Sequence, residues 1–196
     1  MVHQPQTTPP TGSATRQRLL LVLPMLLAFA LGLFLYHGIG KDPNAMPSSL
    51  IGSQVPTFAG ETLLAPITTV TQADLLGQPA LINVWATWCP TCRAEHEFLN
   101  QIASQEGVRI FGVNYHDQRA SAQQWLLELG NPYVFSIFDP NGVVGIELGV
   151  VGAPETYLID AQGKVIDKLT GELNERTWPP LRDQYLALPA GVDNGQ

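Results

Sequence analysis

Apolar and polar residues follow a pattern along the chain that predicts strands and helices in turn. Residues 80–86, ALINVWA, form an apolar run typical of a strand buried on both faces, and residues 108–113 form a second one. Residues 93–104 and 121–129 carry apolar side chains at helical spacing, and Gly130 stands where a helix C-cap is expected. Parallel strands joined by crossover helices are therefore expected in this half of the chain.

The pattern after Gly130 predicts shorter elements. In order, they are a strand at 134–138, a helical turn at 143–148, strands at 155–160 and 164–169, and a helix at 175–188 that opens after Asn174. The last two strands flank Ala161-Gln162-Gly163, which predicts a hairpin. Residues 63–70 are apolar but contain Pro66, so they can form an edge strand or a hairpin arm at best.

The only two cysteines of the chain, Cys89 and Cys92, directly follow the first buried strand, at the point where a helix is expected. A C-x-x-C pair in this place, within alternating strands and helices that end in a hairpin, indicates a thioredoxin-like fold. We therefore expect a three-layer α/β sandwich over residues 55–188.

A charge-free apolar run, LLLVLPMLLAFALGLFLY, occupies residues 19–36. In a helix these residues would span about 27 Å, close to the hydrocarbon thickness of a membrane. Arg16 and Arg18 precede the run and all 17 Asp and Glu residues follow it, which predicts a cytoplasmic N-terminus and an exported domain. Ala28-Phe29-Ala30 has the form of a signal-peptidase site, but the apolar run continues to Tyr36, which favours an uncleaved anchor.

These features divide the chain into five expected parts. They are a cytoplasmic tail (1–18), a transmembrane helix (19–36), a periplasmic linker rich in Gly, Pro and Ser (37–54), the folded domain (55–188) and a flexible C-terminal tail (189–196). The exported part is acidic and lacks basic clusters, which argues against nucleic acid as a partner.

The cysteine pair has three possible explanations: a structural disulfide, half of a zinc site, or a redox pair. A disulfide between residues three apart closes a small loop and stabilises little. A zinc site needs two more ligands. The histidines of the chain are His3, His37, His96 and His116. They are scattered without ligand spacing, so we expect neither a metal nor another cofactor and favour a redox-active disulfide.

A cysteine at a helix N-terminus lies beside unpaired N–H groups and the positive end of the helix dipole, which lower its pKa. Cys89 is thus expected to be the exposed nucleophile, and Pro90 suits the first helical turn. Cys92, one turn further in, is expected to be the shielded resolving thiol. Trp88 is expected to form a half-exposed apolar lid beside the pair.

Two carboxylates near the pair bear on the direction of electron flow. Glu95 lies three residues beyond Cys92 on the same helix face, and Glu155 follows Pro154. Negative charge near Cys89 disfavours its thiolate, which favours a reductant over an oxidant. The alternative for Glu95 is an ordinary solvated glutamate.

Two further residues depend on the expected fold. Pro154 is expected to be a cis-proline packed against the disulfide, with a plain loop proline as the alternative. Asn83 lies six residues before Cys89, where thioredoxins carry a buried acid that helps the second cysteine lose its proton. Because an amide cannot accept that proton, Glu95 or water would have to do so.

Four stretches of this sequence resemble the CcmG/DsbE family of thiol:disulfide interchange proteins, which act in cytochrome c maturation. They are GKDPNAMPSSLIG (40–52), NVWATWCPTCRAEH (83–96), GVNYHD (112–117) and GVVGAPETYLID (149–160). The likeness runs from the apolar run to the final helix, and the last stretch is the most specific of the four.

The resemblance implies a single-pass protein of the bacterial inner membrane with its C-terminal domain in the periplasm. Its function would be to reduce the haem-binding C-x-x-C-H cysteines of apocytochrome c, directly or through a maturation protein with its own C-x-x-C pair. Electrons would come from a transmembrane thiol donor of the DsbD or CcdA kind. The alternatives are a thioredoxin-like enzyme with another periplasmic client, and a non-catalytic adaptor that holds apocytochrome.

The resemblance also implies roles for individual residues. Cys89 and Cys92 would be the redox pair, Pro154 the cis-proline, and Glu95 and Glu155 the acidic residues that tune the site. The residues expected to contact the substrate are Trp88, Pro90, Thr91, Asn114, Tyr115 and Ala153.

Overall fold

The computed structural model describes residues 23–34 and 50–189, which belong to two separate compact units, residues 1–45 and 46–196. In the first unit, residues 23–34 form a helix whose side chains are exposed. None of the helices in the described ranges is both long and apolar enough to span a membrane. Several predicted parts of the chain lie outside the described residues. They are the cytoplasmic tail, the C-terminal tail except Pro189, residues 37–49 of the linker, and both ends of the predicted membrane span.

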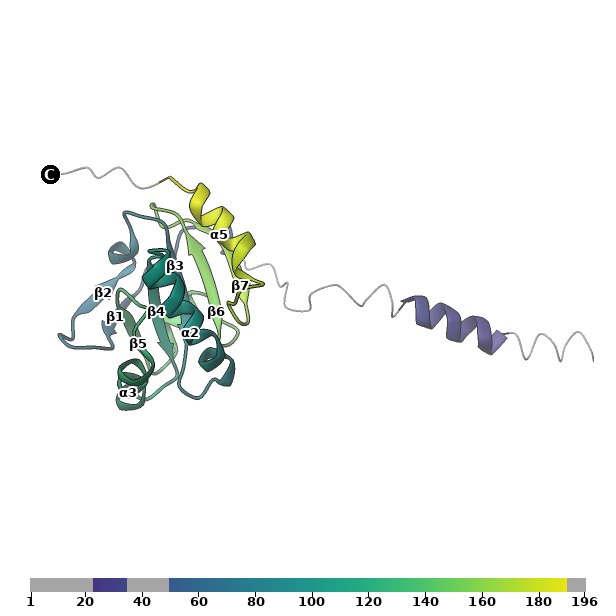
Figure 1. Ribbon diagram of the computed structural model, residues 1–196, viewed down its shortest axis with the longest axis horizontal. Helices are drawn as coiled ribbons and strands as arrows, with labels where there is room; N and C mark the ends of the chain where they lie inside the picture. The colour runs from purple at the N-terminus through teal and green to yellow at the C-terminus, as the bar shows by residue number, and fades with distance from the viewer. Residues whose placement is uncertain (1–22, 35–49, 190–196) are drawn as a thin grey trace, which may run out of the picture. The chain divides into compact units, whose positions relative to one another are not determined.

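The second unit is built on a seven-stranded sheet (Figure 1). Its strands are β1 (Ala59–Thr62), β2 (Thr69–Thr71), β3 (Ala80–Trp85), β4 (Ile110–Tyr115), β5 (Ser136–Asp139), β6 (Glu155–Ile159) and β7 (Val165–Thr170). Their order in the sheet is β2-β1-β5-β4-β3-β6-β7. The central strands β3, β4 and β5 are parallel, and β6 and β7 form the antiparallel hairpin. The predicted combination of parallel crossovers and a terminal hairpin is confirmed.

Helices cover both faces of this sheet. They are the 3₁₀ helix η1 (Gln72–Leu75), α2 (Pro90–Gln105), α3 (Arg119–Leu129), α4 (Val143–Glu147) and α5 (Trp178–Ala187). Apolar side chains of α2, α3 and α5 join one core cluster, whereas those of η1 and α4 join the other. Figure 1 shows α2 and α5 lying over the same face of the sheet. The thioredoxin-like α/β fold is therefore confirmed.

Strand β3 explains why its sequence reads as one apolar run. Leu81 and Trp85 belong to the core beneath α2, while Ile82 and Val84 belong to the core on the opposite face. Every residue of the strand is buried. Asn83 is the one polar residue of this run, and strand alternation directs it toward α2.

Three local expectations turn out differently. Residues 63–68 form a loop with a cis Ala65–Pro66 bond, so of the edge strand or hairpin arm expected at 63–70 only the end is strand, in β2, which lies at the sheet edge and pairs antiparallel with β1. Residues 50–54 were expected to belong to the linker, but they adjoin β7 through backbone hydrogen bonds and a bridge between Gln54 and Lys164. The last helix begins at Trp178 rather than at Glu175, because residues 175–177 form a separate turn in which the Asn174 side chain accepts hydrogen bonds from two N–H groups.

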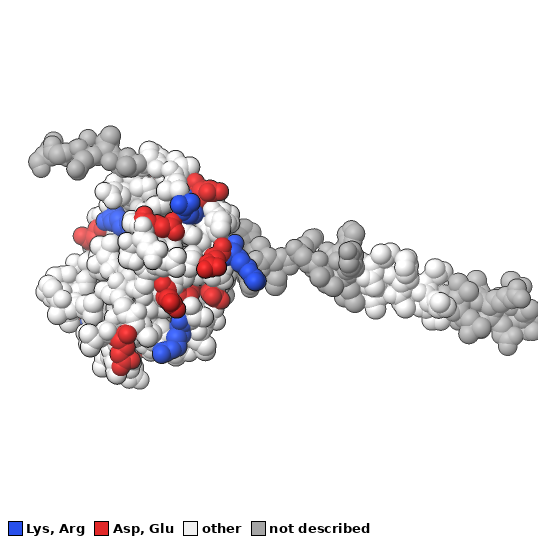
Figure 2. Space-filling view, viewed as in Figure 1, with Lys and Arg blue, Asp and Glu red and all other residues white. Residues whose placement is uncertain are grey.

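Charged side chains are dispersed over the visible face of the domain (Figure 2). Acidic and basic groups are intermixed there, without a gathering of Lys and Arg. That face therefore presents no basic surface of the kind that binds polyanions.

Candidate active site

Cys89 and Cys92 form a disulfide at the N-terminus of α2. Cys89 is the N-cap of this helix, and its Sγ accepts a hydrogen bond from the Cys92 N–H at 3.0 Å. Pro90 lies in the first turn, which needs no N–H from it. The predicted position of the pair is confirmed, and a Cys89 thiolate formed on reduction would face the helix N–H groups.

The exposure of the two cysteines differs from the prediction. Cys89 is only 3 % exposed and Cys92 2 %, so the expected contrast between an open and a shielded sulfur is wrong for this disulfide-bonded state. Ala153 lies over Cys89, with its carbonyl oxygen 3.4 Å from Cys89 Sγ. Trp88 is 53 % exposed, as expected, and Pro90 and Thr91 are exposed beside it.

The Ala153–Pro154 bond is cis, as expected. Pro154 directly precedes β6, and β6 pairs antiparallel with β3, so that Glu155 lies opposite Val84. Because β3 runs into the cysteine motif, this pairing brings Ala153 to Cys89 although 64 residues separate them.

Glu95 is fully buried and shares the buried side of α2 with Cys92. Its carboxylate accepts hydrogen bonds from Asn83 Nδ2 at 3.0 Å and from the Leu173 N–H at 2.9 Å. Burial raises the pKa of Glu95 from 4.5 to about 7, although both hydrogen bonds oppose the rise. The alternative of a solvated helix glutamate is therefore wrong.

Asn83 occupies the buried strand position beneath the pair and connects Glu95 to its surroundings. Its Nδ2 also donates to Thr156 Oγ1 at 3.1 Å, and its Oδ1 accepts from the Tyr133 hydroxyl at 2.9 Å. Tyr133 lies 50 residues from Asn83 and belongs to no motif that indicates such a contact, so the sequence alone does not predict its role.

Glu155 lies on the other side of the sheet. Its strand neighbour Thr156 faces Asn83 and α2, so strand alternation turns Glu155 away from the helix. Its carboxylate pairs with Lys168 Nζ at 2.9 Å and accepts a hydrogen bond from the Tyr157 hydroxyl at 2.8 Å. The expectation that Glu95 and Glu155 converge on the cysteine pair is therefore wrong.

Asn114 was expected to contact substrate but is fully buried. Its Nδ2 donates to the Asp117 carboxylate at 2.9 Å. That carboxylate also accepts hydrogen bonds from the N–H and the hydroxyl of Thr87, both at 2.6 Å. Asn114 and Asp117 thus hold the segment before Trp88, which corrects the prediction for Asn114; Asp117 lies within the GVNYHD stretch, but its role was missed.

Tyr115 is partly exposed and packs against α4. A Cβ atom on Gly145 would lie 2.5 Å from the Tyr115 ring, so only glycine allows this contact. The neighbouring His116 accepts a hydrogen bond on its carbonyl from Trp88 Nε1 at 3.0 Å. The segment that carries Tyr115 therefore supports Trp88 beside the disulfide.

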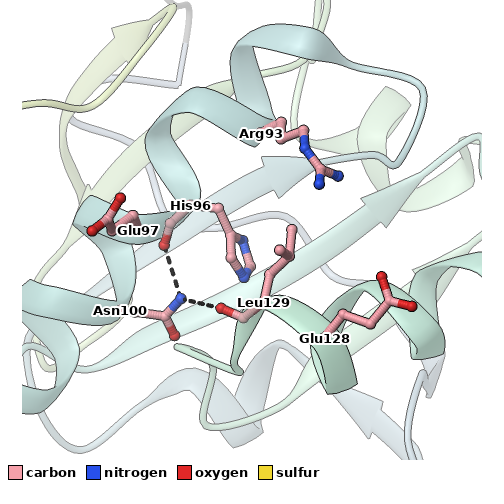
Figure 3. Close-up of a pocket in the computed structure, with 6 residues that line it drawn as sticks. All are labelled: Arg93, His96, Glu97, Asn100, Glu128 and Leu129. Atoms are coloured by element: carbon pink, nitrogen blue, oxygen red, sulfur yellow. Dashed lines mark hydrogen bonds between the residues drawn. The ribbon is translucent and has the colours of Figure 1, made fainter.

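A pocket of about 440 Å³ opens between α2 and the end of α3 (Figure 3). Arg93, His96, Glu97, Asn100, Glu128 and Leu129 line it. His96 uses both ring nitrogens, one with Gly130 O and one with Trp125 Nε1, and burial lowers its pKa. The pocket includes neither cysteine. Within residues 23–34 and 50–189, no group of three or more His, Cys, Asp or Glu side chains is arranged to hold a metal ion.

Comparison with known proteins agrees with this geometry. The Redoxin family matches residues 50–184. The chain is 46 % identical over 177 residues to the thiol:disulfide interchange protein DsbE of Pseudomonas aeruginosa, covering 88 % of this chain and 98 % of that protein. It is 52 % identical over 172 residues to DsbE of Yersinia pestis, covering 85 % and 90 %.

A solved structure shows the same fold. The crystal structure of a secreted thiol-disulfide isomerase from Corynebacterium glutamicum superposes with a TM-score of 0.59 at 29 % identity, covering 68 % of this chain and 83 % of that one. The chain therefore belongs to the Redoxin family, among the DsbE thiol:disulfide interchange proteins, and is a protein thiol-disulfide oxidoreductase that works through Cys89 and Cys92.

Proposed function

We propose that this oxidoreductase is a membrane-tethered periplasmic reductant of cytochrome c maturation. Its client is the disulfide of an apocytochrome c haem-binding C-x-x-C-H motif, or of a maturation protein that passes electrons to that motif. The observation that carries the proposal is the buried Glu95 carboxyl group, on the same buried side of α2 as Cys92, which has hydrogen-bond donors but no cation among its described contacts.

The reaction is a two-electron exchange. The Cys89 thiolate attacks a client sulfur, a mixed disulfide forms, and the first client thiolate leaves. The Cys92 thiol then transfers its proton to the Glu95 carboxylate, and its sulfur attacks Cys89. This step releases the second client thiolate and forms the Cys89–Cys92 disulfide, so the client is reduced and the protein oxidised. A transmembrane thiol donor of the DsbD or CcdA kind returns the two electrons.

The environment of the pair favours this direction. Strong oxidants stabilise their reduced form through a very low nucleophile pKa. Here an ionised Glu95 on the same buried helix side disfavours a neighbouring thiolate. A carboxyl group with a pKa of about 7 also exists in both protonation states at neutral pH, as a proton acceptor for Cys92 requires.

The N-terminal region supports the tether. Residues 23–34 are helical and uncharged, with large exposed apolar side chains such as Met25 and Phe34. They lie within the apolar run at 19–36, which follows Arg16 and Arg18. A tether raises the effective concentration of the reductant near membrane partners, in a compartment that oxidises free thiols.

Trapping of the client tests the proposal. In the full-length chain, Cys92→Ser leaves the mixed disulfide unresolved, and we expect mass spectrometry to identify apocytochrome c or a C-x-x-C maturation protein bound to Cys89. Cys89→Ser is the matched control and should trap neither. Capture of unrelated periplasmic proteins alone would contradict the proposed client.

The reduction potential tests the direction of electron flow. We expect a value near that of thioredoxin, about −270 mV, whereas a value near that of DsbA, about −120 mV, would exclude a reductant. The protein with Cys89→Ala and Cys92→Ala should fail to restore cytochrome c in a deletion strain. Restoration by that variant would instead indicate an adaptor that holds apocytochrome.

A further inference from the structure

The Asn83 side chain can be oriented in two ways, and only one of them suits an ionised Glu95. An amide presents an oxygen acceptor on one side and an N–H₂ donor on the other. With the N–H₂ group toward Glu95, one hydrogen is donated to Glu95 Oε1 and the other to Thr156 Oγ1. In the reverse orientation, the amide oxygen would face the carboxylate and repel its charge.

Tyr133 distinguishes these two orientations. Its hydroxyl donates to Asn83 Oδ1 at 2.9 Å, which leaves the N–H₂ group facing Glu95. Burial raises the pKa of Tyr133 well above 10, and the charge of Glu95 raises it further, so the hydroxyl remains a donor. The ring is stacked on Trp85 with a centroid distance of 5.6 Å, which holds the hydroxyl in place.

We propose that Tyr133 is a positioning residue of the exchange reaction, because its hydroxyl holds the Asn83 amide in the orientation that keeps the Glu95 carboxylate ready to accept the Cys92 proton. The consequence for the reaction rests on the proposed role of Glu95. The effect on Glu95 itself rests only on the chain of two hydrogen bonds from Tyr133 through Asn83.

The other groups around Glu95 do not replace this chain. On α2 they are Cys92 and His96, and His96 is directed to Gly130 and Trp125. From the segment before α5 come the Leu173 N–H, which donates to Glu95, and the charge of Glu172, which raises its pKa. Tyr133 is the described residue that bonds the oxygen of the Asn83 amide, whereas Thr156 accepts from its nitrogen.

Tyr133→Phe in the full-length chain tests the proposal, since it removes the hydroxyl and keeps the stacked ring. We expect the midpoint of the Glu95 titration, followed by ¹³C NMR of labelled glutamate and assigned with Glu95→Gln, to move to higher pH. A rise of about one pKa unit would lower the ionised fraction of Glu95 at pH 7 about five-fold. The rate at which Cys92 displaces glutathione from a Cys89–glutathione mixed disulfide should fall about as much at pH 7 and recover at higher pH.

Two further variants separate positioning from general damage. Tyr157→Phe removes a buried hydroxyl from the opposite face of the sheet and should leave the Glu95 titration unchanged. Asn83→Leu removes the amide donor and should raise the Glu95 midpoint on its own. Tyr133→Phe should then add nothing to Asn83→Leu, because the hydroxyl acts through the amide.

The outcomes are distinct. An unchanged Glu95 midpoint in Tyr133→Phe, or equal shifts in Tyr133→Phe and Tyr157→Phe, would overturn the proposal. A shifted midpoint with an unchanged exchange rate would support Tyr133 as the residue that positions Asn83 and would contradict Glu95 as the proton acceptor. Because glutathione replaces the client, none of these results depends on the proposed role in cytochrome c maturation.

Discussion

Glu95 and Glu155 are both completely buried, yet their surroundings on opposite faces of the sheet differ in one decisive respect. Glu95 accepts hydrogen bonds from the Asn83 amide and the Leu173 N–H, which are neutral donors. Glu155 forms an ion pair with Lys168, whose side chain is only 6 % exposed. Burial of a carboxylate without a cation favours its protonated form, which is the case of Glu95.

Glu155 holds a loop beside the disulfide, whereas Glu95 lies on the helix that carries Cys92. The group around Glu155 holds the loop that carries Ala153: Glu155 accepts from the Val151 N–H at 3.1 Å, and the Tyr157 hydroxyl lies 3.0 Å from Leu148 O. Glu95 instead lies one helical turn from Cys92, where the proposed function uses it as a proton acceptor. Under the proposed function, two glutamates of equal burial therefore serve the same site in different ways, one by gaining and losing a proton and the other by anchoring the loop.

Removal of the Lys168 cation should have the largest effect on the free energy of unfolding. Lys168→Met would leave the Glu155 charge buried and unpaired, and we expect a loss of about 3–5 kcal/mol in the free energy of unfolding. Urea unfolding at neutral pH measures this loss. Adding Glu155→Gln to Lys168→Met should recover most of it, and a loss below about 1 kcal/mol in the single variant would show that the ion pair is dispensable.

The free energy of unfolding should fall as the pH rises, because the pKa of Glu95 is raised in the folded state. Its pKa is raised in the folded state, from 4.5 to about 7, so its contribution is fully present below pH 4.5 and is lost as the pH rises through 7. The total is about 3 kcal/mol. Glu95→Gln should remove this decline in urea unfolding of the oxidised protein. Glu97→Gln, an exposed change on the same helix, is the control, and equal slopes in both variants would contradict the assignment.

Loss of the Tyr157 hydroxyl should weaken the Glu155 side moderately. Tyr157→Phe removes a donor to the buried Glu155 carboxylate and keeps the ring, and we expect a loss of about 1–2 kcal/mol. The midpoint of urea unfolding should fall while the slope with urea concentration stays constant. If Tyr157→Phe lowered the free energy of unfolding as much as Lys168→Met, the hydroxyl would stabilise the buried Glu155 carboxylate as much as the ion pair does.

The smallest expected effect is on the pKa of Cys89, which should respond to Glu95 and not to Glu155. Glu95→Gln removes a charge on the same buried helix side as Cys92, and we expect the Cys89 pKa to fall by less than about one unit. Glu155→Gln should leave it unchanged, because Lys168 pairs with that charge on the far face of the sheet. Ultraviolet thiolate absorbance against pH measures both, and equal shifts would contradict the separation.

The features visible in the sequence were those with a local cause. The apolar run before Cys89 and the helical spacing after it placed the cysteine pair at a helix N-terminus, and the structure confirms this position. The order of parallel strands and the terminal hairpin followed from the same periodicity. The thioredoxin-like fold predicted a cis bond before Pro154, and the Ala153–Pro154 bond is cis.

Errors arose where a residue's role depends on distant contacts. Asn114 was expected to contact substrate, but it lies in the buried strand β4 and donates to Asp117, which also accepts from Thr87, 30 residues away. Cys89 was expected to be exposed, but Ala153, from the other half of the chain, lies over it. Local pattern cannot report such contacts, since they arise when strands far apart in sequence become neighbours.

Periodicity and the C-x-x-C spacing are thus enough to identify a thioredoxin-like redox pair and a nearby glutamate. They cannot tell which buried carboxylate carries a cation and which does not. Lys168 reaches Glu155 through the β6–β7 pairing, and Tyr133 reaches Asn83 across 50 residues of chain. Charge compensation acts over a few ångströms of space, so the partners of Glu95 and Glu155 follow from the packing of the folded domain.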